Sequence, residues 1–172
     1  MQSSRYDYSS VHVDVPLPVS KDIVEWGRAN VIDDDIYVSQ KDPGFGREDE
    51  MHVTILYGIH TDKSEVVKEI IEKQGPVRVT LNKIGVFTNP FKFDVVMIQC
   101  ISDDLKRLNE KLENSVKFTN KYKHYQPHVT IAYVKKGKGW KHHGIDLWQG
   151  KEFQCDYAVF SSKNGGKEKI IL

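Results

Sequence analysis

The sequence predicts an α+β fold of two similar lobes, and a repeated motif together with the order of the predicted elements supports this. Residues 51–57 (MHVTILY) recur as 127–133 (PHVTIAY). Each copy has the alternation of a strand and lies near a predicted helix and further strands. We therefore expect one domain over residues 1–172, in which two pseudo-symmetric lobes each contribute a motif strand to a central cleft. Mixed or antiparallel sheets with flanking helices are the expected framework.

The first half of the chain alternates between strand and helix patterns. The predicted elements are a strand at 11–17, a helix at 20–30, strands at 36–39 and 51–57, and a helix at 62–74. Ser20 can cap the first helix, and Gly75-Pro76 ends the second. A polar loop rich in proline and glycine, residues 41–50, precedes the first motif strand.

The second half has one helix among several strands. The predicted strands are 77–86, 93–101, 128–134, 153–160 and 167–172. Ser102 begins a helix in which Leu105, Leu108 and Leu112 follow helical spacing. Asn164-Gly165-Gly166 predicts the turn of a closing hairpin.

Composition indicates a globular protein of the cytoplasm. The 172 residues include 39% hydrophobic and 10% aromatic residues, with a net charge of +1. This charge gives no global attraction to long nucleic acids or membranes, and no apolar run is long enough to span a bilayer. The N-terminal segment has no apolar stretch typical of a secretion signal. Cys100 and Cys155 lie in apolar strand patterns, which predicts buried free thiols in a reducing compartment.

A basic stretch surrounds the second motif. Residues 114–145 contain no acidic residue but several lysines and histidines, among them Lys121 and Lys138. Such a local field suits a phosphate-bearing ligand, although a solvated lysine-rich surface is the simpler alternative. Within it, Lys135 and Lys136 are candidate substrate-binding residues, and Trp140 is a candidate to stack on a base.

The repeated motif places four polar side chains on one face. Because strand residues alternate between faces, His52 and Thr54 share one side while Val53 and Ile55 share the other. The same parity applies to His128 and Thr130. If the two strands are neighbours, two imidazoles and two hydroxyls converge.

These groups suit the cleavage of a phosphodiester. One imidazole can accept a proton from the attacking oxygen, and the other can donate a proton to the leaving oxygen. The threonine hydroxyls can bind the non-bridging oxygens. We therefore predict His52, Thr54, His128 and Thr130 as catalytic; the alternative is that all four are ordinary strand residues. Pro127 excludes a helix that would pair His124 with His128 at a metal, so neither a metal nor another cofactor is expected.

Tyr57 and Tyr133 stand at the same offset after each motif histidine. Strict parity directs both away from the histidines, toward the core or the strand ends. Twisted strand ends would bring them to the rim of the cleft, so both are also candidate substrate-binding residues.

The doubled His-Val-Thr-Ile resembles the signature of the 2H phosphoesterase superfamily. Residues 46–62 (GREDEMHVTILYGIHTD) and 127–135 (PHVTIAYVK) are most similar to phage-associated members, such as the anti-CBASS cyclic-oligonucleotide phosphodiesterases. The resemblance implies a bilobal fold, chemistry without a metal, and small substrates. Those substrates include cyclic dinucleotides, 2′,5′-linked oligonucleotides and 2′,3′-cyclic phosphates.

Three functions remain open at this point. The first is a phosphodiesterase for cyclic di- or trinucleotides or 2′,5′-linked oligonucleotides, which in a phage would act against defence in the host cytoplasm. The second is an enzyme that opens 2′,3′-cyclic phosphates at RNA ends. The third is a nucleotide-binding module without catalysis, although binding alone does not require two proton-transfer groups. A monomer with a small nucleotide or oligonucleotide as partner is expected in each case.

Overall fold

The computed structural model describes residues 7–90, 92–120 and 122–172. The N-terminal segment considered above and Lys121 of the basic stretch lie outside these residues. In chain order the elements are β1 (Ser9–Asp14), α1 (Val19–Asn30), η1 (Asp33–Asp35), β2 (His52–Ile59), α2 (Glu65–Glu72), β3 (Val77–Thr88), β4 (Phe93–Ile101), α3 (Asp103–Glu113), β5 (His128–Lys135), η2 (Trp140–His142), β6 (Glu152–Cys155), β7 (Tyr157–Ser161) and β8 (Lys167–Ile171). No helix in the described part is long and apolar enough to cross a bilayer.

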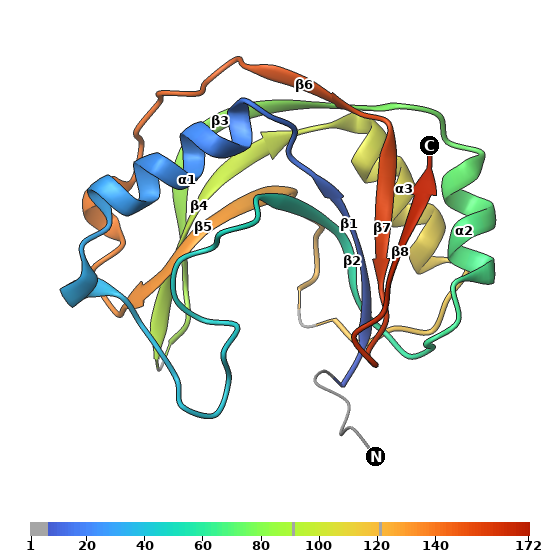
Figure 1. Ribbon diagram of the computed structural model, residues 1–172, viewed down its shortest axis with the longest axis horizontal. Helices are drawn as coiled ribbons and strands as arrows, with labels where there is room; N and C mark the ends of the chain where they lie inside the picture. Colours follow the sequence, from blue (N-terminus) through green and yellow to red (C-terminus); the bar gives the residue numbers. More distant parts are fainter. Residues whose placement is uncertain (1–6, 91, 121) are drawn as a thin grey trace.

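The strands form one curled sheet in the order β6-β3-β4-β5-β2-β1-β7-β8, and neighbouring strands are antiparallel. Figure 1 shows helices α1, α2 and α3 on the outer side of the curl, while the inner side stays free of helices. We call this inner side the concave face. The architecture confirms the predicted α+β class.

The two motif strands join the two halves of this sheet. Within the described residues β2 and β5 share one pair of Cα partners, Val53 and Val129, before they diverge. The loop at 36–48 then occupies the free edge of β5. The amide of Tyr37 donates to the carbonyl of Tyr133 at 2.9 Å, and the amide of Glu48 donates to the carbonyl of Ile131 at 2.9 Å. This loop is thereby fixed beside the second motif.

Two strand predictions were wrong in detail. Residues 36–39 form no strand, because this loop meets β5 at separate points, and Ile36 makes only an isolated bridge to Val134. The predicted strand 153–160 is divided at Asp156. Its first part, β6, pairs with β3, whereas its second part, β7, pairs with β1 and β8, so the chain passes from one half of the sheet to the other.

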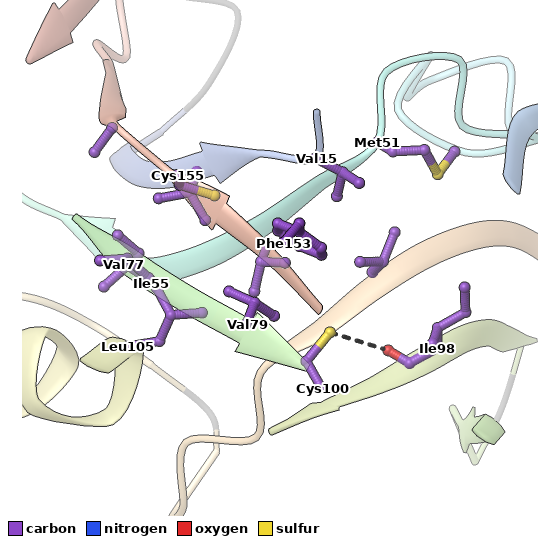
Figure 2. Packing of buried hydrophobic residues seen from close by; sticks show 14 of the residues in the cluster. Val15, Met51, Ile55, Val77, Val79, Ile98, Cys100, Leu105, Phe153 and Cys155 are labelled. Atoms are coloured by element: carbon purple, nitrogen blue, oxygen red, sulfur yellow. Dashed lines mark hydrogen bonds between the residues drawn. The ribbon is translucent and has the colours of Figure 1, made fainter. Parts of the chain in front are cut away.

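The core lies between the sheet and the helices. Helix α3 begins as predicted at Ser102, whose hydroxyl accepts a hydrogen bond from the amide of Leu105 at 3.1 Å. Figure 2 shows both cysteines among buried apolar side chains. Cys100 and Cys155 are free thiols, as predicted, and burial raises the pKa of each to about 12. Neither thiol is therefore a nucleophile at neutral pH.

Candidate active site

The site is built around the Val53–Val129 pair. Both valines are fully buried toward the helices, so the residues that flank them point to the concave face. In an antiparallel pair with this register, His52 lies beside Thr130, and His128 lies beside Thr54. Those four side chains are partly exposed. The structure therefore brings the four predicted residues together on one face.

Both motif imidazoles are oriented in the same way. Nδ1 of His52 lies 3.0 Å from the carbonyl oxygen of Glu50, and Nδ1 of His128 lies 2.8 Å from that of Gln126. Since a carbonyl oxygen can only accept, each Nδ1 carries its hydrogen and donates it. Nε2 of each ring is then the nitrogen that can exchange a proton with a substrate.

The surroundings of the two imidazoles differ. Burial lowers the pKa of His128, and the charge of His52 lowers it further. The ring of Phe87 also packs on His128, with centroids 4.9 Å apart. His52 lies close to the carboxyl of Glu48, whose pKa is raised by burial while the charge of His52 opposes that rise. The apolar environment of His128 favours a neutral ring, whereas His52 has an acidic side chain, Glu48, as its neighbour.

A third histidine, His12, belongs to the same cluster and was not identified from the sequence. Its ring lies 5.0 Å from that of His52, and its Nε2 lies 3.2 Å from the carboxylate of Asp14. Burial, followed by the charge of His52, lowers the pKa of His12 to about 4, so the contact is a hydrogen bond from a neutral ring. The hydroxyl of Tyr157 donates to the other oxygen of Asp14 at 3.1 Å. In the sequence, His12 and Asp14 alternate with Val11 and Val13, and this strand pattern could have indicated that both polar side chains share one face.

The two repeated tyrosines lie on the concave side, contrary to strict parity. On β1, Val11 pairs with Leu56 and His12 with Thr54, so Ile55 is an extra residue in β2. A register shift in β4–β5 likewise leaves Ile131 as an extra residue. A bulge of this kind reverses the side to which the following residues point. Tyr57 is consequently 50% exposed between buried neighbours, and Tyr133 is partly exposed.

Each tyrosine belongs to a small aromatic group. The Tyr57 group comprises Tyr8, Tyr57 and His60, in which the Tyr8 ring lies 6.3 Å from Tyr57 and 5.2 Å from His60. The Tyr133 group comprises Tyr37, Phe45, Phe93 and Tyr133, with neighbouring centroids 5.0–5.6 Å apart. Because β2 and β5 are antiparallel, the two groups lie toward opposite ends of the His–Thr centre.

The remaining predicted binding residues are not brought to that centre. The ammonium group of Lys135 donates to the carbonyl of Asp34 at 2.6 Å, and that of Lys136 donates to the carbonyl of Pro90. Trp140 is 52% exposed in η2, a segment whose His142 packs against α1 on the outer side. Their roles in binding stay predictions.

A pocket of about 270 Å³ opens beside His128, and His128 itself forms part of its wall. A second pocket, about 200 Å³, lies at the β7–β8 hairpin, and neither motif histidine lines it. No three His, Cys, Asp or Glu side chains in the described ranges are grouped so as to hold a metal ion.

Solved structures share this fold over nearly the whole chain. Protein TT0787 of Thermus thermophilus has a TM-score of 0.61 at 18% identity, covering 96% of this chain and 94% of that one. LigT of Escherichia coli, solved with 3′-AMP, has a TM-score of 0.59 at 11% identity, covering 97% and 95%. A structure described as a phosphoesterase has a TM-score of 0.57 at 14% identity, covering 96% and 95%. Curated protein sequences give no significant match.

The curled antiparallel sheet, with a His-x-Thr strand from each half, defines the protein as a 2H phosphoesterase. The family model of the 2′-5′ RNA ligase superfamily matches residues 18–159, a range that includes both motif strands. The chain belongs to this superfamily.

Proposed function

We propose that this protein is a metal-independent phosphodiesterase that cleaves cyclic di- or trinucleotides or 2′,5′-linked oligonucleotides, with His52 and His128 as its proton-transfer groups. The observation that carries this proposal is the arrangement of the two motif strands. Their shared Val53–Val129 pair places both imidazoles and both threonines on one face, and each imidazole is held through Nδ1.

The two imidazoles have different roles in this mechanism. His128 starts neutral, in keeping with its lowered pKa, and its Nε2 takes the proton of the attacking water as the new P–O bond forms. His52 acts as the general acid and gives its Nε2 proton to the leaving oxygen as the old P–O bond breaks. The reaction leaves His128 protonated and His52 neutral, and exchange with solvent restores both. Thr54 and Thr130 donate to the non-bridging oxygens, where negative charge accumulates.

The two aromatic groups support a nucleotide substrate. A phosphodiester at the His–Thr centre has the Tyr57 group toward one end and the Tyr133 group toward the other, and aromatic rings stack on bases of any sequence. A linkage with a base on each side uses both groups, whereas a 2′,3′-cyclic mononucleotide uses one. The presence of 3′-AMP in a LigT structure is consistent with a small nucleotide ligand.

A substrate panel tests the proposal. The protein is incubated in EDTA with cyclic di- and trinucleotides, 2′,5′-oligoadenylate and 2′,3′-cyclic nucleotides, and products are separated by chromatography. We expect cleavage of the cyclic di- and trinucleotides and of 2′,5′-oligoadenylate. The double variant His52→Ala/His128→Ala should cleave none of them. Cleavage of 2′,3′-cyclic nucleotides alone favours the RNA-end enzyme, and tight binding without cleavage favours the binding module. Activity that EDTA removes and a divalent ion restores contradicts metal independence.

A counter-defence role in a phage is the biological extension of this proposal. It requires that the preferred substrates be cyclic oligonucleotides, because these are the signals that such an enzyme would remove. A preference for linear 2′,5′-linked substrates in the same assay argues against this role.

A further inference from the structure

The pocket beside His128 shares that histidine with the catalytic centre but has a different chemical character. Its lining residues include Asn82, Gln99 and Gln126, which carry side-chain amides, together with the apolar residues Phe87 and Met97. At about 270 Å³ it lies just below the range of about 300–1,000 Å³ that holds a drug-sized molecule. It therefore has room for part of a substrate, such as one planar ring system.

The three amides are available to a ligand. Within residues 7–90, 92–120 and 122–172, the side-chain amides of Asn82, Gln99 and Gln126 make no hydrogen bond to protein. Each amide offers a donor and an acceptor side by side. This pattern matches the edge of a nucleobase, as in the two hydrogen bonds that Asn or Gln makes to adenine.

The rest of the lining favours a base over a phosphate. Lys106 is the one fixed cation among the lining residues, whereas Phe87 and Met97 provide apolar surface for a ring. Phe87 also contacts the ring of His128, so a base in the pocket lies next to the imidazole that acts on its own phosphate. We propose that this pocket binds one nucleobase of the substrate and that its amides select that base by its hydrogen-bonding edge. This inference rests on the proposed phosphodiesterase function.

Gly85 of β3 provides a way to disturb the pocket without removing an amide. A Cβ at Gly85 would lie 2.8 Å from the terminal methyl of Met97 and 3.0 Å from the amide nitrogen of Gln99. Both atoms are at the ends of flexible side chains, so Gly85→Ala displaces them while the sheet is retained. Gln99→Leu removes the amide and keeps the size of the side chain.

Binding of four nucleoside 3′-monophosphates and of inorganic phosphate, measured by calorimetry, tests the inference without turnover. We expect the wild type to prefer one base over the least favoured base by about 5- to 150-fold. Gln99→Leu and Gly85→Ala should bring the four affinities together and leave phosphate binding unchanged. Gln149→Leu makes the same chemical change at an exposed position outside the pocket and should retain the preference.

Two results would overturn the inference. One is equal affinity of the wild type for all four bases, and the other is a loss of phosphate affinity in Gln99→Leu as large as the loss for nucleotides. If the wild type discriminates between bases but cleaves no phosphodiester, the base pocket is supported and the proposed function is contradicted. If the wild type cleaves phosphodiesters without any base preference, the proposed function is supported and the base pocket is contradicted.

Discussion

His12 of β1 lies against His52 of β2, with ring centroids 5.0 Å apart and ring planes at 57°. His12 is anchored on Asp14, which in turn accepts a hydrogen bond from Tyr157. The other motif histidine, His128, has the apolar ring of Phe87 as its aromatic neighbour. The two halves of the site are thus similar in backbone but different in the groups that surround each imidazole.

The first prediction concerns stability in acid. Burial and the charge of His52 lower the pKa of His12 from 6.5 to about 4, so between these values the unfolded chain binds a proton that the folded chain excludes. Stability contributed by neutral His12 is present at neutral pH and is lost as pH falls through this window. Across the whole window the effect is about 3–4 kcal/mol. Urea unfolding at pH 7.5 and pH 4.5 should show a smaller pH difference for His12→Phe than for the wild type.

The comparison isolates His12 because other groups titrate in both proteins. His128 and His142 also have lowered pKa values and destabilise the fold in acid in the same direction. An equal loss of stability in wild type and His12→Phe would show that His12 does not control this response.

The second prediction concerns the two catalytic histidines. His52→Ala and His128→Ala should each lower kcat by about 10²- to 10⁴-fold, the usual contribution of a positioned acid or base. The two imidazoles act in one proton-transfer cycle, so the double variant should be little slower than the slower single variant. The control His143→Ala removes an exposed histidine outside the site and should keep full activity. If the double variant cleaves the substrate at the wild-type rate, neither histidine is catalytic.

The third prediction concerns the threonines. Thr54→Val and Thr130→Val keep the shape of the side chain but remove the hydroxyl donor, and each should lower kcat by about 10- to 100-fold. This is less than for the histidines, because a neutral donor supplies only part of the charge stabilisation. Thr88→Val, at an exposed position of β3, is the matched control. Steady-state rates that match the control would exclude a role for these hydroxyls.

Local sequence patterns predicted those features that depend on neighbours along the chain. The repeated His-Val-Thr-Ile strands carry their own alternation, and Ser102 caps α3 through an amide three residues away. Features that depend on distant partners were missed. The extra residues Ile55 and Ile131 arise from pairing with β1 and β4, so period-two parity placed the tyrosines on the wrong side.

The same limit explains the other differences. His12 reaches His52 only because β1 pairs with β2, although its alternation with valines marked an open face. Residues 36–39 resemble a strand in composition, but β5 accepts them only at isolated points. In each case the deciding contact joins segments far apart in the chain.

The last prediction concerns the two aromatic groups. Stacking on a base contributes about 1–3 kcal/mol, so Tyr57→Ala and Tyr133→Ala should each raise KM for a dinucleotide substrate by about 5- to 150-fold, with a small effect on kcat. Tyr57→Phe and Tyr133→Phe keep the ring and should stay close to wild type. A 2′,3′-cyclic mononucleotide has one base, so only one of the two alanine variants should affect it. Melting temperatures show whether each alanine variant keeps its fold. Folded alanine variants with an unchanged KM would show that the rings pack the loops and do not bind the substrate.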